Sequence, residues 1–381
     1  MEMKDYKQLL KLAFLGGAID SAIGYTHYIA SQMDHHFILS AGCFSKRESI
    51  NQETAHTWGV DEKHLYSNWE GLLESEQKRI DAVVILTPTP NHHEMVMKAL
   101  ELGYCVICEK ALATTHDEGL EISKKLDEKK AFLAVTHNYT GYSMLRELQN
   151  MIREDQLGKI THINIEMPQE SFARLVNGKQ PTPQVWRLHD GLISGVSLDL
   201  GTHMQHMIYF LTKENPSELV ADSSSFGWFD KIVDDVSCIL RYPSGMRVQM
   251  YYGKVSLGHR NGLKVRVYGT KGSAEWFQMQ PEELMYNTID GARMIIDRAS
   301  PNVKIANQSR YNRFKSGHPA GFIEAFGNLY VDIAQELSKY KIDNNYKSDW
   351  SYGAIQATKG LEVFEAIQIS SKKNKWVKIR E

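Results

Sequence analysis

The chain has 381 residues, of which 42% are hydrophobic and 24% are charged, and its formal net charge is −2. This length is enough for two domains with their own cores, and the composition is that of a globular protein rather than a disordered one. The balanced charge argues against a nucleic-acid partner or an anionic membrane surface. No apolar run approaches the roughly 20 residues that span a bilayer. The N-terminal residues lack the layout of a signal peptide and four cysteines make no disulfide framework, so we expect a cytoplasmic protein.

The first part of the chain alternates short apolar runs with helical stretches. The runs cover residues 12–15, 37–44, 82–86, 104–108 and 132–136. Continuous apolar runs of this length are typical of parallel strands that are buried on both faces. We therefore predict a doubly wound parallel sheet with ligands at the carboxyl ends of its strands.

Helix signals lie between these runs. Asn91 and Thr115 each precede a glutamate by three residues, which predicts capped helix starts at both positions. Gly103 predicts the end of the helix that Asn91 opens. Cys105 and Cys108 fall within a strand, where residues three apart point to opposite faces. We interpret them as buried thiols rather than as a redox pair or metal ligands.

The pattern changes after about residue 140. Helices are predicted at 143–155, around 197–211, near 319–338 and near 351–369, and strands at 161–167, 237–242, 247–252, 263–269 and 274–278. Pro243-Ser244-Gly245 predicts a hairpin turn between two of these strands. The β-branched and aromatic strands predict a largely antiparallel sheet with helices on one face. Residues 288–318 are expected to form a long irregular loop.

Gly16 and Gly17 follow the first strand where a helix is expected to open. Glycine permits a tight turn and lets the backbone approach a pyrophosphate, whose negative charge the helix N-terminus attracts. In the usual G-x-G-x-x-G pattern, Ala18 and Ser21 here occupy the second and third glycine positions. An ordinary strand-to-helix turn is the alternative. The place at the head of an alternating segment favours a dinucleotide loop, with contacts from Gly16, Gly17, Ser21 and Ile23.

The second strand is followed by Ser45, Lys46 and Arg47. An NAD site normally offers an acidic residue here for the ribose hydroxyls, whereas these three residues could hold a 2′-phosphate and so favour NADP. The alternative is that both cations are solvated charges at a helix start.

Two prolines stiffen the loop that follows the third strand. This loop and the next helix start contain Thr87, Pro88, Asn91 and His92. Because they lie at the carboxyl edge of the sheet, they are candidates for lining a cofactor groove. A simple helix-capping turn is the alternative.

The fourth strand runs directly into Glu109-Lys110-Ala111, which places an ammonium group at the same edge. Oxidation of a secondary alcohol needs a hydride acceptor and a base for the hydroxyl proton. A lysine side chain, with an ordinary pKa near about 10.4, becomes a useful base when burial or a nearby positive charge lowers that pKa. Glu109, a candidate cofactor contact, would oppose such a shift if its side chain points the same way.

Asp199 and His203 are four residues apart in a predicted helix and therefore share one face. A carboxylate and an imidazole on one face can bind vicinal hydroxyls and relay a proton. His206 lies on roughly the same face, so a metal site of these three residues is a competing interpretation. We favour the proton relay because no further acidic or cysteine ligands cluster nearby. A helix cap for Asp199 and a half-buried structural role for His203 are the plainer alternatives.

Two further pairs are candidates for ligand contact. Trp186 offers an indole face for a sugar ring and Arg187 a guanidinium for hydroxyl or phosphate oxygens, although a packed aromatic beside a surface arginine would also explain the pair. Asn138 and Tyr139 follow the fifth strand, where cofactor and substrate are expected to meet.

Taken in order, Gly16-Gly17, Thr87-Pro88 with His92, Glu109-Lys110 and Asp199-x-x-x-His203 resemble the glucose–fructose oxidoreductase, inositol dehydrogenase and MocA family. The segment 137–142 and Gly317-His318-Pro319 resemble one branch of it. The resemblance covers nearly the whole chain. It implies a Rossmann domain joined to a domain with an open-faced β-sheet, which together bind NAD or NADP and a sugar or cyclitol. It also implies Lys110 as the catalytic lysine, Asp199 and His203 as its partners, and a homo-oligomer, either a dimer or a tetramer.

The chain departs from the family pattern in two places. Ala111 replaces the proline of Glu-Lys-Pro, which removes a conformational restriction on Lys110 and frees a backbone N–H. The glycine motif is also weakened, which leaves the tightness of cofactor binding open.

We therefore expect an α/β protein with a dinucleotide-binding Rossmann domain at 1–138 and an α+β substrate-binding and oligomerisation domain at 139–381. The predicted activity is hydride transfer between NAD(P) and a secondary alcohol of a sugar, a sugar derivative such as a nucleotide sugar, or a cyclitol. The alternatives are an NAD-dependent glycoside hydrolase that uses a transient oxidation and a dinucleotide-binding sensor without chemistry. The presence of Lys110, Asp199 and His203 argues against the sensor.

Overall fold

The computed structural model describes residues 9–344 and 348–379. The chain divides into two compact units, and each is described by itself. The first contains the residues up to Leu112, Leu120–Asn138 and Phe326–Ala354, and the second contains Ala113–Gly119, Tyr139–Ala325 and the residues from Ile355 on. This division differs from the expected contiguous halves, 1–138 and 139–381, because Phe326–Ala354 returns to the first unit and Ala113–Gly119 belongs to the second.

The first unit is built on a five-stranded sheet whose strands are all parallel, in the order β2-β1-β3-β4-β5. The strands are β1 (Leu10–Gly16), β2 (Phe37–Cys43), β3 (Ala82–Leu86), β4 (Cys105–Cys108) and β5 (Leu133–Val135), so all five predicted strands are confirmed. The strand order reverses between β1 and β3. In sheets of this kind, ligands bind outside the carboxyl ends of the strands at that point.

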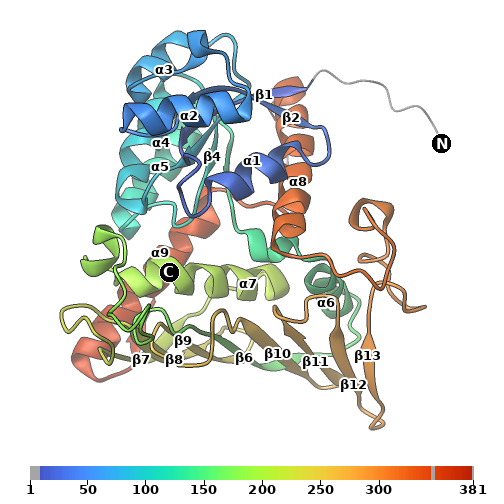
Figure 1. Ribbon diagram of the computed structural model, residues 1–381. Coiled ribbons are helices and arrows are strands. Elements are labelled where there is room, and N and C mark those ends of the chain that lie inside the picture. Colours follow the sequence, from blue (N-terminus) through green and yellow to red (C-terminus); the bar gives the residue numbers. More distant parts are fainter. Residues whose placement is uncertain (1–8, 345–347, 380–381) are drawn as a thin grey trace. The chain divides into compact units, whose positions relative to one another are not determined.

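Helices cover both faces of this sheet (Figure 1). They are α1 (Gly24–Gln32), α2 (Glu48–Trp58), α3 (Trp69–Ser75), α4 (His92–Glu101), α5 (His116–Lys129) and α8 (Phe322–Asp343). Because crossover connections are right-handed, α1 lies on one face and α3, α4 and α5 lie on the other. Helix α8 joins the face of α1, where the rings of Phe326 and Tyr330 contact the imidazole of His27.

Two of the three predicted helix-end signals are confirmed. The Thr115 hydroxyl accepts the backbone N–H of Glu118 at 3.2 Å, and Gly103 has a φ of 81° after the end of α4. The predicted side-chain cap at Asn91 is wrong, because Asn91 ends a 3₁₀ turn (Thr89–Asn91) and makes no capping bond. Its φ and ψ of −96° and −7° are already helical, whereas a capping side chain needs an extended backbone.

The second unit contains a nine-stranded sheet in the order β13-β12-β11-β10-β6-β9-β8-β7-β14. The strands are β6 (Ile160–Pro168), β7 (Glu218–Ser224), β8 (Asp235–Arg241), β9 (Arg247–Gly253), β10 (Lys264–Gly269), β11 (Gly272–Phe277), β12 (Leu284–Thr288), β13 (Arg293–Ile296) and β14 (Val377–Lys378). Only β6 and β9 pair in parallel among these neighbours, so the predicted largely antiparallel sheet is confirmed.

The expectation of an irregular segment at 288–318 is wrong at its beginning, where β12 and β13 form a hairpin at the edge of the sheet. The turn contains Gly291 with a φ of 89°, whose N–H donates to the Thr288 carbonyl at 3.1 Å. Because most of β13 is exposed at the edge, its side chains lack the buried-and-exposed alternation that marks a strand in the sequence.

Helices cover one face of the second sheet (Figure 1). They are α6 (Ser143–Arg153), α7 (Thr202–Thr212), which follows a π-helical turn (Ser197–Gly201), and α9 (Ala354–Lys373). The Gln149 amide joins α6 to α7 by donating to the Phe210 carbonyl at 2.8 Å. Along β6 the buried side chains of Ile163, Ile165 and Met167 alternate with side chains on the opposite face.

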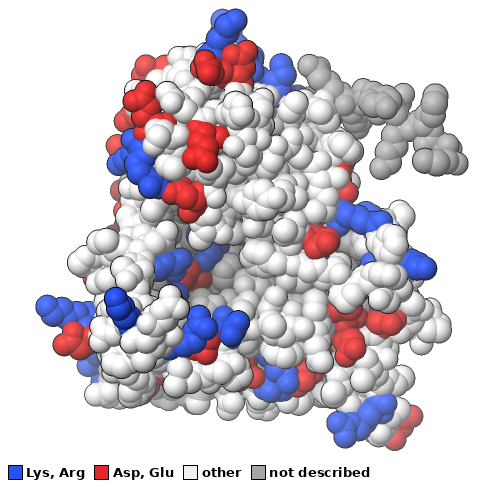
Figure 2. All heavy atoms as spheres, in the orientation of Figure 1, with Lys and Arg blue, Asp and Glu red and all other residues white. Residues whose placement is uncertain are grey.

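Acidic and basic side chains are interspersed over the visible face (Figure 2), in keeping with 44 basic and 46 acidic residues. Within the described ranges, no helix has the length and apolar character needed to cross a membrane.

Glu336 of α8 provides a test of the packing in the first unit. It is 4% exposed and accepts a hydrogen bond from the Ser351 hydroxyl, and burial raises its pKa from 4.5 to about 7. The folded chain therefore holds this proton more tightly than the unfolded chain, and the stability that the proton contributes is lost as the pH rises from 4.5 through 7.

The free energy of unfolding of the wild type should fall as the pH rises from 4.5 through 7. We expect Glu336→Gln to make this fall smaller by up to about 3 kcal/mol. Urea unfolding at pH 5 and pH 8 measures it, because the wild type should lose more stability across that interval than the variant. Asp343→Asn, at an exposed position on the same helix, is the control and should follow the wild type. Equal pH dependence in Glu336→Gln and the wild type would contradict the prediction.

Candidate active site

The residues that follow four adjacent strands of the first unit lie at one edge of its sheet. Gly16 of β1 pairs with Leu86 of β3, so the glycine turn lies next to the turn at Thr87. The Glu109 N–H donates to the Ile85 carbonyl at 3.0 Å, and the Thr136 N–H donates to the Cys108 carbonyl at 2.9 Å. The sheet therefore gathers the predicted candidates at Gly16-Gly17, Thr87-Pro88, Glu109-Lys110 and Asn138.

The glycine turn needs residues without a side chain. Gly16 and Gly17 have φ values of 82° and 73°, which L-residues rarely adopt, and a Cβ on Gly17 would lie 2.5 Å from a methyl carbon of Leu86. Helix α1 begins at Gly24. In the turn before it, the Ser21 hydroxyl accepts hydrogen bonds from the backbone N–H groups of Ile23 at 3.3 Å and Gly24 at 2.7 Å.

Gly24 was missed by the sequence reasoning. A Cβ at this position would lie 2.0 Å from the Gly17 carbonyl oxygen, so its absence lets the helix start approach the turn closely. This is the packing that the third glycine provides in a dinucleotide loop. The signal was present in the sequence, three residues after Ser21 instead of at Ser21 itself.

The residues after β2 lie next to this turn. The guanidinium of Arg47 forms an ion pair with Asp20, which belongs to the glycine loop. Ser45 accepts the Arg47 N–H at 3.1 Å, and its own N–H donates to Asn51 at 3.2 Å. Lys46 and Arg47 are exposed at this end of the sheet.

His92 ties together the loops that follow β3 and β4. It is fully buried, with Nδ1 2.7 Å from the Ala111 carbonyl and Nε2 2.7 Å from the Thr87 carbonyl. Burial lowers the pKa of His92, although both carbonyls favour its protonated form. Because His92 is buried beneath the two loops, it supports them. Pro88 and Asn91 are instead exposed on the surface of the loop.

The peptide bond between Lys110 and Ala111 is cis.

Lys110 is half-buried and Glu109 is buried. The Glu109 carboxylate accepts hydrogen bonds from the Thr136 hydroxyl at 2.5 Å and from His27 Nε2 at 3.1 Å. His137 is also buried, which lowers its pKa to about 3 and keeps its imidazole neutral. Asn138, 2% exposed, opens the 3₁₀ turn Asn138–Gly141.

In the second unit, Asp199 lies in the π-helical turn before α7. Its Oδ2 accepts hydrogen bonds from Arg187 and from the Nζ of Lys254, the latter at 2.5 Å. The Arg187 guanidinium also lies 4.5 Å from the centre of the Trp186 ring. The structure thus places Arg187 against Asp199 and beside Trp186, and all three are predicted site residues.

Lys254 was not among the predicted site residues. It follows directly after β9, and its backbone is fixed by the Asp234 carbonyl and the Phe172 N–H, both at 2.8 Å. Its side chain is 7% exposed and lies 5.1 Å from the Phe172 ring centre. Like Lys110, it is a lysine placed immediately after a strand, which is the signal that could have found it.

His203 contacts Tyr139, whose ring is edge-on to the imidazole with 4.6 Å between ring centres. The Tyr139 hydroxyl accepts a hydrogen bond from Asn261 at 2.9 Å, and Asn261 also donates to Gln278 at 3.1 Å. Burial raises the pKa of Tyr139, so its hydroxyl stays protonated at neutral pH. Tyr139 is therefore held in place and limits the orientation of His203.

His206, the third member of the competing metal interpretation, has its Nε2 3.5 Å from the Thr140 hydroxyl. Across residues 9–344 and 348–379, no group of three or more His, Cys, Asp or Glu side chains is arranged to hold a metal ion. Asp199, His203 and His206 instead have the separate neighbours described above.

Comparison with known proteins gives the same architecture. Residues 11–137 match the model of an oxidoreductase family with an NAD-binding Rossmann fold, and residues 145–275 match the GFO/IDH/MocA C-terminal domain. The chain belongs to the GFO/IDH/MocA oxidoreductase family.

Several relatives of this GFO/IDH/MocA protein match over almost their full length. The oxidoreductase YfiI of Bacillus subtilis is 29% identical over 97% of both chains. The structure of an oxidoreductase from Sinorhizobium meliloti is 30% identical with a TM-score of 0.84, covering 97% of this chain and all of that one. An inositol dehydrogenase homolog from Azotobacter vinelandii, complexed with NADH and myo-inositol, is 25% identical with a TM-score of 0.88, covering 97% and 98%.

The residues of the first unit fit the dinucleotide that the family binds. The space beside Gly17 and Gly24 is too small for a Cβ, so the backbone of the turn packs closely against the helix start, as a pyrophosphate loop requires.

The cysteines of the described chain are free, and burial raises the pKa of Cys105 to about 12. Within β4, Cys108 is buried as expected, whereas Cys105 is half-buried.

We expect Gly24→Ala to weaken dinucleotide binding, because its Cβ would lie 2.0 Å from the Gly17 carbonyl oxygen and backbone would have to move. The expected cost in stability is about 1–3 kcal/mol, with a rise of tenfold or more in the Kd for the dinucleotide. Fluorescence titration and urea unfolding measure the two effects. Gly191→Ala is the control, because its nearest neighbour would be 3.9 Å away. Normal affinity in Gly24→Ala would show that the close packing is dispensable.

Proposed function

We propose that this protein transfers hydride between NAD(P) and a secondary alcohol of a sugar, a sugar derivative or a cyclitol. The observation that carries the proposal is the position of Lys110, directly after β4 and at the sheet edge that also holds the glycine turn. The family match supports a dinucleotide oxidoreductase, and the Azotobacter neighbour with bound NADH and myo-inositol supports a polyol substrate.

In this proposal Lys110 exchanges the proton of the reacting hydroxyl. The bound nicotinamide supplies the hydride acceptor or donor. Lys110 is half-buried, so its amine can reach a ligand while the neighbouring Glu109 and Ala111 stay buried. His92 and the ladder bonds of Glu109 hold the backbone on both sides of the lysine, which limits the positions that its amine can occupy.

Asp199 and His203 bind and orient the substrate hydroxyls. Arg187 and Lys254 donate to the same Asp199 oxygen, which fixes the position of the carboxylate. His203 passes a proton to or from the hydroxyl and is oriented by the Tyr139 ring. Trp186, beside Arg187, offers an aromatic face for the C–H groups of a sugar ring, and Tyr139 supports the substrate side through its contact with His203.

The proposed cofactor is NAD or NADP, and the residues after β2 favour NADP. Lys46 and Arg47 are exposed cations where an NAD site would normally have a carboxylate. The pairing of Arg47 with Asp20 partly offsets this charge, and the Azotobacter neighbour holds NADH. Both dinucleotides therefore belong in the assay.

We expect Lys110→Ala to lower kcat by about 10²–10⁴-fold, the usual contribution of a positioned acid or base. The dinucleotide Kd should stay within about threefold, because the glycine turn is untouched. Turnover is followed through the absorbance of reduced nicotinamide, with sugars, inositols and nucleotide sugars and with each dinucleotide. Lys124→Ala, at a side chain that is 79% exposed, is the matched control.

Normal turnover in Lys110→Ala would overturn the assignment of the base. Glycoside cleavage without net change in nicotinamide absorbance would favour the hydrolase alternative. Dinucleotide binding without turnover of any polyol or glycoside would favour the sensor.

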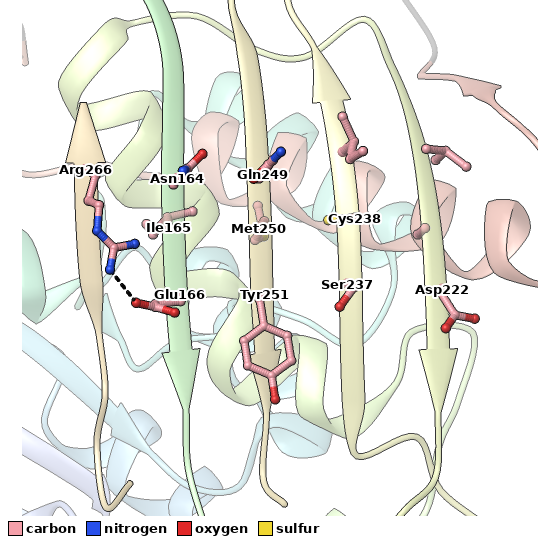
Figure 3. Close-up of a pocket in the computed structure, with 13 residues that line it drawn as sticks. Asn164, Ile165, Glu166, Asp222, Ser237, Cys238, Gln249, Met250, Tyr251 and Arg266 are labelled. Atoms are coloured by element: carbon pink, nitrogen blue, oxygen red, sulfur yellow. Dashed lines mark hydrogen bonds and ion pairs between the residues drawn. The ribbon is translucent and has the colours of Figure 1, made fainter. Parts of the chain in front are cut away.

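The proposal also includes a homo-oligomer, a dimer or tetramer, formed through the outer face of the nine-stranded sheet. Figure 3 shows Asn164, Gln249 and Tyr251 projecting from β6 and β9 on the side away from the helices. This face contains a hollow of about 510 Å³ that spans β10, β6, β9, β8 and β7. Ile239, on the same face, is 41% exposed, and apolar side chains on an open sheet favour burial by a partner.

We expect light scattering of the wild type to give a mass that is a multiple of the chain mass. Ile239→Lys should lower this mass toward that of a single chain, because a buried unpaired ammonium opposes association. Ile342→Lys, at a residue of α8 that is 86% exposed, is the control and should leave the mass unchanged. A wild-type protein that runs as a single chain, or an Ile239→Lys variant with unchanged mass, would contradict the proposed interface.

A further inference from the structure

The Glu109 carboxylate is bonded to side chains from two other segments of the first unit, and a third segment contacts one of these side chains. Its Oε1 lies 3.1 Å from Nε2 of His27 in α1 and 2.5 Å from the hydroxyl of Thr136, which follows β5. Its Oε2 accepts the backbone N–H of Lys110 at 3.1 Å. On the far side of the imidazole, His27 Nδ1 lies 2.8 Å from the hydroxyl of Tyr330 in α8.

The hydrogen-bond pattern assigns the protons in this group. Burial by itself would raise the pKa of Glu109, but hydrogen bonding from His27, the charges of His27 and Lys110, and the Thr136 hydroxyl bring it below its usual value, so the residue is a carboxylate. A carboxylate only accepts, so His27 donates through Nε2–H. The Nδ1 of His27 is bonded to the Tyr330 hydroxyl, and burial raises the pKa of Tyr330, so this hydroxyl keeps its proton.

We propose that Glu109 is a positioning residue for Lys110 and that His27 and Tyr330 hold it in that role. This inference rests on the function proposed for Lys110. The carboxylate fixes the backbone of Lys110 through its own N–H, so it sets the direction in which the side chain leaves the chain. It also places a negative charge at the residue next to Lys110.

The burial of the group explains why its members act together. His27 is fully buried, Thr136 is fully buried and Tyr330 is 1% exposed, so each lost hydrogen bond would leave a polar atom without water. The aromatic rings of Phe326 and Tyr330 contact the imidazole and limit its rotation. The carboxylate is thus fixed by packing as well as by hydrogen bonds.

Other titratable groups of the first unit also surround Glu109 and Lys110. His137 and His92 are buried, and burial lowers the pKa of both, so they stay neutral at pH 8. Cys108 is buried, and its pKa is raised well above the usual value. None of these groups changes charge near pH 8.

The test is competitive acetylation of the full-length protein with a trace of acetic anhydride at pH 8 and pH 10, followed by mass spectrometry. Labelling of Lys110 is expressed relative to the exposed Lys124, so no turnover is required. In Glu109→Gln, we expect labelling at pH 8 to rise by about tenfold, because loss of a neighbouring negative charge favours the neutral amine. Labelling at pH 10 should rise much less, which separates a charge effect from greater exposure.

Tyr330→Phe removes only the hydroxyl that is bonded to His27 Nδ1 and should change Lys110 labelling in the same direction by a smaller factor. Tyr340→Phe, on the same helix, removes a hydroxyl that donates to the Lys130 carbonyl and is the matched control. Where turnover is measured, Glu109→Gln should lower kcat at its optimum by about tenfold.

Equal labelling of Lys110 in the wild type and Glu109→Gln, or an equal rise at both pH values, would overturn the positioning role and leave Glu109 a structural residue. Labelling that responds as expected, in a protein whose Lys110→Ala variant keeps full activity, would instead overturn the proposed function and retain the coupling between Glu109 and Lys110. The two proposals therefore fail by different observations.

Discussion

Parallel pairing of β1, β3, β4 and β5 is the constraint on which the rest of the first unit depends. Parallel strands all end at the same edge, so the residues that follow them gather there regardless of their separation in the chain. The glycine turn, the Thr87 loop, Lys110 and Asn138 need no contact of their own to become neighbours. The arrangement requires short apolar strands and tight turns between the strands and the helices. The glycine turn is tight enough that a Cβ at Gly17 or Gly24 would clash with neighbouring atoms.

The second unit fixes its polar side chains by a different physical means. Asp199 lies in a π-helical turn, and two cations from other segments, Arg187 and Lys254, converge on one of its oxygens. A partly buried carboxylate remains ionised when charged donors replace its lost hydration. His203 is oriented by a ring contact with Tyr139, whose hydroxyl is held by Asn261. Charge therefore fixes one group and packing fixes the other.

The sequence allowed the local features to be predicted, because each depends on residues close together in the chain. The five buried strands, the Thr115 cap and the end of α4 at Gly103 follow from apolar runs and from single capping residues. The edge hairpin of β12 and β13 did not follow, because an exposed edge strand carries no buried face. The return of Phe326–Ala354 to the first unit depends on long-range packing, such as that of Tyr330 on His27. His27 was missed for the same reason, since its importance lies in a partner 82 residues away.

Lys110 and Lys254 both follow strands, but the two lysines differ in the groups that surround them. The Nζ of Lys254 lies 2.5 Å from the Asp199 carboxylate in a buried position, and such a pair favours the ammonium form and a fixed geometry. Its role is to hold Asp199. The carboxylate next to Lys110 has its oxygens engaged by His27, Thr136 and the backbone N–H of Lys110 itself, so it acts on the lysine through backbone direction and through charge at a distance. Lys110 is half-buried at the sheet edge that also holds the glycine turn, whereas the Lys254 side chain is 7% exposed and bonded to Asp199. This placement is the physical reason for proposing Lys110 as the base.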